Sequence, residues 1–138
     1  MAQNQVWYVA GMHTFTTRVY LEDVDAGGIV YHANYLKYAE RARTEWLAGS
    51  GIRHAQVMVQ GAAIIVKSLF IDYLLPLRLE QDVRIDTRVV KSGGASAELE
   101  QLIYGHAGLC ARLQVELVHT VGGKPVRWSE PLKAILSA

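Results

Sequence analysis

Two carboxylates and an imidazole stand close together near the start of the chain. Asp23 and Asp25 precede a pair of glycines, Gly27 and Gly28, and His32 follows them. A carboxylate can act as a general base toward water or as a nucleophile toward an acyl carbon. Asp is also common in turns, where its side chain accepts backbone hydrogen bonds, so Asp25 could instead cap this turn. The residue types alone leave both interpretations open.

A helix predicted to begin near residue 34 supplies the second part of this chemistry. The first backbone N–H groups of a helix have no partners within it and carry partial positive charge, so they can hold the oxyanion of a tetrahedral intermediate. Asp23 and Asp25 are two residues apart, so in an extended segment both carboxylates would point the same way. The stretch therefore suggests attack on a carbonyl group, or water activated against it, with His32 donating to the oxyanion or positioning the substrate.

The helix that must hold this stretch is predicted over residues 34–48. Its apolar residues recur at helical spacing and form one stripe, Tyr35, Ala39, Ala42 and Trp46, flanked by Leu36, Arg43 and Leu47. The opposite side is polar, with Glu40, Arg41, Thr44 and Glu45. Glycines at 49 and 51 are expected to end the helix.

Strands are predicted on both sides of the helix. One covers residues 15–21, and four long strands follow at 62–74, 83–89, 96–104 and 109–117, with alternating apolar and polar residues and Gly-rich turns between them. A short helical turn is expected within 52–61 and another at 131–136. The chain is therefore predicted to be one α+β domain over 1–138, a curved antiparallel five-stranded sheet around one central helix, with residues 1–13 as a peripheral lead-in.

Composition and charge exclude several classes of function. The chain has 14 basic and 13 acidic residues without a basic cluster, which argues against nucleic-acid binding. The histidines are scattered and Cys110 is the single cysteine, so neither a metal site nor a disulfide is predicted. No apolar run is long enough to cross a membrane, and the uncharged first residues lack the pattern of a signal peptide. We expect a cytoplasmic protein, and the 51% hydrophobic content suggests an oligomer interface.

The motif that contains these acids resembles a known family. Tyr20-x-x-Asp23-x-Asp25-x-x-Gly28-Ile29-Val30-Tyr31-His32-x-x-Tyr35, followed by Glu40-Arg41-Ala42-Arg43-Thr44-Glu45, is similar to the 4-hydroxybenzoyl-CoA thioesterases, which are hotdog-fold enzymes. Within them it resembles the Tol-Pal-associated acyl-CoA thioesterases. The resemblance implies a hotdog fold, an acyl-CoA substrate, water as second substrate and no cofactor. It also implies a dimer joined edge to edge, often paired into a tetramer, with the active site at the subunit interface.

The resemblance also assigns roles to individual residues. It makes Asp25 the catalytic acid, as general base or nucleophile, and leaves Asp23 as support. The backbone near Tyr31 and His32 would bind the oxyanion, the His32 imidazole would assist, and Gly28 would fold the chain back. A functional link to the Tol-Pal system of the cell envelope is implied by resemblance alone.

Only some of the family's coenzyme A contacts have counterparts in this sequence. Lys91, Ser96 and Lys67 are candidate contacts to CoA, although the turn after Lys91 lacks the Arg that the family often has there. Leu21 stands where the Tol-Pal-associated group usually has a second Tyr, so no role for that hydroxyl is assigned. Lys91 could equally be a solvated turn residue.

Two other functions are consistent with the same residues. A hotdog protein could hydrate or dehydrate a 3-hydroxyacyl thioester, which needs a His and an acid placed to move a Cα proton and a hydroxyl. It could also bind acyl-CoA or a partner protein without catalysis, although the acid pair argues against that.

Overall fold

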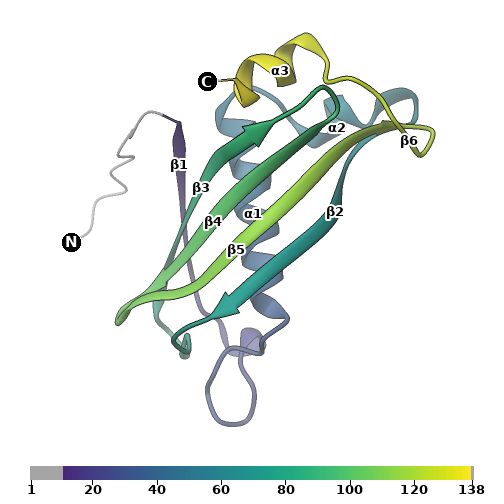
Figure 1. Cartoon of the computed structure of the whole chain (residues 1–138). Helices are drawn as coiled ribbons and strands as arrows, with labels where there is room; N and C mark the ends of the chain where they lie inside the picture. Colours follow the sequence, from purple (N-terminus) through teal and green to yellow (C-terminus); the bar gives the residue numbers. More distant parts are fainter. Residues whose placement is uncertain (1–10, 138) are drawn as a thin grey trace.

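A curved antiparallel sheet wraps one long helix in the computed structural model, which describes residues 11–137 (Figure 1). The helix is α1 (Asn34–Gly49). The strands are β1 (Met12–Arg18), β2 (Ala62–Tyr73), β3 (Asp82–Ser92), β4 (Ser96–Gly105) and β5 (Gly108–Val121), in the sheet order β1-β3-β4-β5-β2. The short β6 (Lys124–Pro125) also pairs with β5. The predicted α+β architecture, with five main strands around one helix, is confirmed.

Short helical elements lie at the two ends of the sheet. One is the 3₁₀ helix η1 (Leu21–Asp23), in the loop before α1. At the other end lie α2 (His54–Val57), the 3₁₀ turn η2 (Val59–Gly61) and α3 (Glu130–Leu136) (Figure 1). The helical turns predicted within 52–61 and 131–136 are thus confirmed. Within residues 11–137, no helix combines the length and apolar character that a membrane crossing requires.

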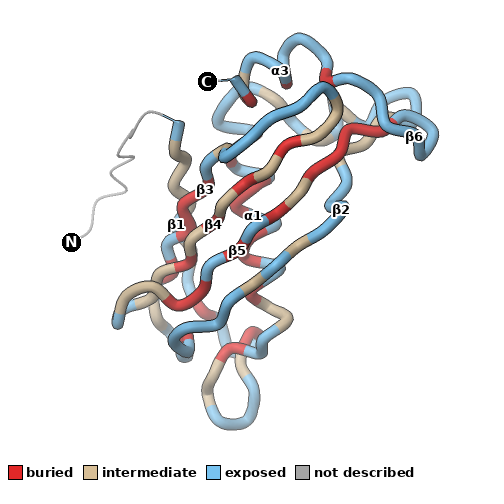
Figure 2. Tube along the Cα trace, viewed as in Figure 1, coloured by how far each residue is buried: buried red, intermediate tan, exposed pale blue. Residues whose placement is uncertain are grey.

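The core lies between one face of α1 and the concave face of the sheet. The predicted stripe, Tyr35, Ala39, Ala42 and Trp46, is buried, and Tyr38 and Leu47 widen it. Of the residues predicted to flank the stripe, Arg43 and Leu47 are buried and Leu36 is exposed. On the sheet, buried positions follow β4 and β5 (Figure 2), with Leu99, Ile103, Leu113 and Val115 fully enclosed. Burial of these two apolar surfaces against each other is the main driving force for this fold.

A buried polar network joins α1 to the sheet. Nη1 of Arg43 donates to Oε1 of Gln101 at 2.9 Å, and Nε2 of Gln101 donates to the carbonyl of Ala39 and to Oγ1 of Thr87. Burial lowers the pKa of Arg43, while the negative charge of Glu40 raises it. Each polar atom of Gln101 thus has a partner, which fixes how the middle of the helix sits on β3 and β4.

The first strand differs from the prediction. It covers Met12–Arg18 instead of residues 15–21, and Met12 and His13 pair with Arg88 and Thr87 of β3. These two residues therefore belong to the strand and not to the predicted lead-in. Residues 1–10, which make up the rest of the lead-in and on which the signal-peptide prediction is based, lie outside the described residues. The strand ends early because the N–H of Tyr20 donates to Oδ2 of Asp23, which turns the chain into η1.

Candidate active site

Asp23 holds together the two ends of the loop before α1. Its carboxylate is buried and accepts hydrogen bonds from the N–H of Tyr20 at 2.9 Å and from Nδ2 of Asn34 at 3.1 Å. Its carbonyl oxygen accepts the N–H of Tyr31 at 3.1 Å. Both acceptor groups of Asp23 therefore connect η1 to the first residues around the helix start. This geometry fits the supporting role expected for Asp23.

Asp25 lies at the exposed tip of the same loop. Its Oδ1 accepts the N–H groups of Gly27 at 2.9 Å and Ile29 at 3.3 Å, while Oδ2 has no hydrogen-bond partner within residues 11–137. Gly28 has φ of +76°, a conformation that favours glycine, and its N–H returns to the carbonyl of Asp25. The turn-capping geometry is thus present, and it leaves one carboxylate oxygen available for chemistry.

The expected extended segment between the two acids is not formed. Asp23 belongs to η1, and it is buried, whereas Asp25 is exposed and has different hydrogen-bond partners. A 3₁₀ turn removes the period of two on which the expectation rested. In the single chain the two carboxylates are therefore held as separate groups, one inside the loop and one at its surface.

The backbone at the helix start offers free donors at two positions. The N–H of Tyr31 is used by Asp23, and the N–H of Asn34 donates to the carbonyl of Tyr31. The N–H groups of His32 and Ala33 donate to no acceptor within residues 11–137. These groups, next to the positive end of the α1 dipole, can stabilise a developing negative charge.

Tyr73, the last residue of β2, fixes the peptide that carries one of these donors. Its hydroxyl donates to the carbonyl of His32 at 2.8 Å. That carbonyl and the N–H of Ala33 belong to one planar peptide unit, so the bond sets the direction of the Ala33 N–H. The exposed His32 ring lies 4.4 Å from the Tyr31 ring, centroid to centroid, and 6.4 Å from that of Tyr73.

An open groove lies beside these donors. It has a volume of about 320 Å³, and its lining is mostly apolar: Ile29, Val30, His32, Tyr35, Tyr73, Leu74, Leu75 and Pro76. The Tyr35 hydroxyl accepts the N–H of Leu77 at 3.0 Å, and burial raises the pKa of Tyr35. A groove of this kind suits an acyl group placed against the helix start. It was not predicted from the sequence that residues 73–76 line the groove. The usable signal is an aromatic residue, Tyr73, at the end of a predicted strand shortly before Pro76.

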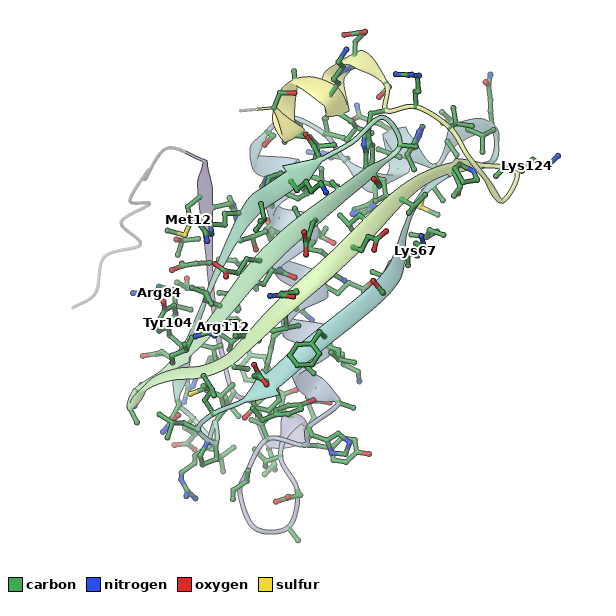
Figure 3. All side chains as sticks on the ribbon, viewed as in Figure 1. Met12, Lys67, Arg84, Tyr104, Arg112 and Lys124 are labelled. Atoms are coloured by element: carbon green, nitrogen blue, oxygen red, sulfur yellow. The ribbon has the colours of Figure 1, made fainter. Side chains whose placement is uncertain are left out.

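The candidate CoA residues lie away from this groove in the single chain. Lys91 and Ser96 flank the β3–β4 turn at the end of the sheet near α3 (Figure 1), where the carbonyl of Ser96 accepts Nε1 of Trp128. Lys67 projects from the middle of β2 (Figure 3), 3.5 Å from the Glu116 carboxylate. The structure therefore brings Asp25, Tyr31 and His32 into one loop but does not bring the three CoA candidates to them.

Together these features define the hotdog class of protein, as predicted: a sheet curled around a helix, with a groove lined in part by residues at the helix start. The chain belongs to the thioesterase-like superfamily, whose family model matches residues 19–136. That range contains the loop, the helix and β2–β5. The predicted family is thereby confirmed.

Individual relatives agree with this assignment. The chain is 36% identical over 124 residues to the acyl-CoA thioesterase YbgC of Haemophilus influenzae, covering 88% of this chain and 91% of the relative. It is 40% identical over 86 residues to the acyl-CoA thioester hydrolase YbgC of Escherichia coli O6:H1, covering 62% of this chain and 64% of the relative. The crystal structure of a probable thioesterase from Bartonella henselae superposes with a TM-score of 0.81 at 30% identity, over 86% of this chain and 99% of the other.

Proposed function

We propose that this chain hydrolyses acyl-CoA thioesters to the free acid and CoA in the groove at the start of α1. The free N–H groups of His32 and Ala33, close in the chain to the Asp25 carboxylate, are the observation that carries the proposal. Asp25 is tied to the groove through the N–H of Ile29, a lining residue. The names of the relatives support the same reaction.

The thioester carbonyl would lie against the helix start. Its oxygen would accept the N–H groups of His32 and Ala33, which polarises the carbon and stabilises the tetrahedral intermediate. One such donor typically lowers the barrier by about 3 kcal/mol. The apolar walls of the groove would hold the acyl group, with the exposed rings of Tyr31 and His32 positioning the substrate at its edge.

Asp25 would supply the attack through its free Oδ2. As a general base, it takes a proton from water while the water oxygen bonds to the acyl carbon; the C–S bond then breaks and CoA leaves as a thiolate that is protonated. As a nucleophile, it forms a mixed anhydride with release of CoA, and water then hydrolyses the anhydride. Both routes need only water as second substrate. Gly28 shapes the turn and Asp23 holds the loop, so both act by positioning.

We further propose that the chain works as a homo-oligomer, either a dimer or a dimer of dimers. β2 ends the strand order and pairs only with β5 among the described residues, so its other edge is free. Ile65, Val66 and Phe70 on this strand are exposed apolar residues, which is unusual for an edge in contact with water. Lys91, Ser96 and Lys67 lie away from the groove of their own chain. A role in CoA binding would therefore require that they contact CoA bound at the groove of a second chain. Sedimentation equilibrium tests this, because a mass of 15.3 kDa at assay concentrations would contradict it.

Two further proposals concern where the protein works in the cell. We propose a cytoplasmic location because Cys110 is the single cysteine of the chain, so no internal disulfide can form, which fits a reducing compartment. The link to the Tol-Pal system rests on resemblance. Cell fractionation with an antibody to the full chain would test the location.

A thiol-release assay tests the reaction. Purified chain should release free thiol from at least one member of a panel of straight-chain and aromatic acyl-CoAs. Asp25→Asn should lower kcat/KM by about a hundredfold or more, while Asp72→Asn, at an exposed carboxylate of β2, should not. Change in enoyl absorbance without thiol release would indicate a hydratase or dehydratase. Binding of acyl-CoA without either signal would indicate a non-catalytic module.

A further inference from the structure

A second cavity lies at the end of the fold opposite the groove. It has a volume of about 500 Å³ and lies between the 51–62 connection and the start of α3 (Figure 1). Apolar walls come from Ile52, Val57 and Leu132. The length of α1, 16 residues, separates it from the groove by roughly 24 Å. The cavity is therefore a separate site from the one where Asp25 and His32 lie.

His119 forms one wall of this cavity and is held rigidly. Its Nδ1 lies 3.0 Å from the carbonyl oxygen of Val126 and 3.1 Å from that of Arg127. Its backbone N–H donates to the carbonyl of Ala95, and its ring stacks on Trp128 with centroids 5.5 Å apart. Because both neighbours of Nδ1 are acceptors, Nδ1 must carry the proton. In the tautomer with its proton on Nδ1, the lone pair is at Nε2.

The Nε2 atom is an acceptor without a partner. His119 is only 7% exposed, and Nε2 accepts no hydrogen bond from any group within residues 11–137. Within residues 11–137, only Nδ1 of His13 and Oη of Tyr38 are both fully enclosed and without a hydrogen-bond partner. Nε2 of His119 is not among them, so this atom is still reachable by a ligand. A buried acceptor without a partner gains from any donor that can be brought to it.

The chemistry of the walls limits what can bind. None of the lining residues is Lys, Arg, Asp or Glu, so a charged molecule would lose its hydration without an ionic partner. We propose that this cavity is a second ligand site, which takes a small neutral hydrophobic molecule that donates one hydroxyl to Nε2 of His119. The apolar walls hold its body, and the locked imidazole selects the hydroxyl. The uncharged polar residues Gln56, Gln60 and Ser129 also line the cavity. A largely apolar lining with a few placed polar groups is typical of small-molecule sites.

The site is tested with two matched probes on the full chain. 4-Propylphenol carries a hydroxyl donor, and 4-propylanisole has the same body with the hydroxyl hydrogen replaced by methyl. ¹⁵N NMR should show a saturable shift of His119 Nε2 with the phenol, together with shifts at the amides of Ile52, Val57 and Leu132. The anisole should bind about fivefold more weakly, which is the effect of one hydrogen bond.

Two variants separate the hydrogen bond from the cavity. His119→Phe keeps a ring but removes the acceptor, so both probes should bind it equally. Val59→Trp fills the mouth of the cavity from an exposed lining position and should weaken both probes more than about tenfold. Val90→Trp, at an exposed position outside the cavity, should bind as wild type. The amide spectra of each variant report whether it is folded.

The proposal is overturned by any of three results. One is the absence of a saturable shift with 4-propylphenol in the wild-type chain. Another is equal affinity for the two probes in the wild type, or a preference for the phenol that persists in His119→Phe. The third is a set of shifts that map to the groove at His32 and Tyr73 and are unaffected by Val59→Trp.

Discussion

The hydroxyl of Tyr73 donates a 2.8 Å hydrogen bond to the carbonyl of His32 and so joins the end of β2 to the start of α1. The residues are 41 positions apart in the chain. Through the rigid peptide unit, the bond sets the direction of the free Ala33 N–H. Tyr73 is therefore a positioning residue for the proposed oxyanion site.

Tyr73→Phe should lower thioester hydrolysis by about threefold to tenfold, because the Ala33 N–H loses its fixed direction. The loss should appear in kcat more than in KM. The free energy of unfolding should fall by less than about 1 kcal/mol, since the side chain is partly exposed. Tyr104→Phe, on the outer face where the ring lies beneath the guanidinium of Arg84 (Figure 3), is the matched control. Equal losses of activity in both variants would contradict the assignment.

Asp23→Asn should destabilise the loop that carries Asp25. The N–H of Tyr20 and Nδ2 of Asn34 now donate to different oxygens of the carboxylate. The new amide keeps only one acceptor oxygen, so its NH2 group must face one of these two donors. We expect a loss of about 2 kcal/mol in urea unfolding and a lower kcat. Glu22→Gln changes the adjacent exposed carboxylate and should leave both quantities near wild type. A stable but inactive Asp23→Asn protein would instead indicate a direct role in the reaction.

Local periodicity was sufficient to predict most of the architecture. The stripe from Tyr35 to Trp46 repeats at the helical period, and the strands alternate over long stretches, so their burial follows from their own residues. The Gly27–Gly28 turn was equally local. In contrast, β1 was placed too late, because Tyr20 and Leu21 have strand-like side chains and the hydrogen bond to Asp23 that ends the strand is not visible in their pattern.

The functional groups depend on contacts that a local pattern cannot supply. The family resemblance implies oxyanion donors near Tyr31 and His32, but which N–H groups are free depends on the bond from Tyr31 to Asp23. The contact of Tyr73 with His32 depends on where β2 ends against β5. Arg43 was expected only beside the apolar stripe, and its burial against Gln101 of β4 depends on the packing of two elements.

The Arg43–Gln101 pair should show strong coupling in a double-mutant cycle. Gln101→Leu removes the side-chain partner recorded for the buried guanidinium, and we expect a loss of about 3 kcal/mol in the free energy of unfolding. Arg43→Met leaves Oε1 of Gln101 without its donor and should cost about 1–3 kcal/mol. The double variant should lose less than the sum, because neither polar group is then left unpaired. Additive losses in urea unfolding would contradict a coupled pair.

His13 should make the stability of the fold depend on pH. Burial lowers its pKa below the ordinary value of 6.5, against an opposing effect of Glu45, and its Nδ1 is enclosed without a partner. The unfolded chain therefore binds a proton more readily than the folded chain. Stability is complete above pH 6.5 and falls as the pH drops from 6.5 toward the lower folded-state pKa.

The measurement is the free energy of unfolding in urea between pH 7.5 and 5.5 for the wild type and His13→Gln. The wild type should lose stability below about pH 6.5, the ordinary histidine value, and the variant should lose less over the same interval. Glu45→Gln removes the opposing charge and lowers the folded-state pKa of His13 further. This variant should therefore lose more stability than the wild type over the same pH interval. If His13→Gln had the same pH dependence as the wild type, another group would be responsible, and the enclosed imidazole would be protonated as easily in the folded chain as in the unfolded one.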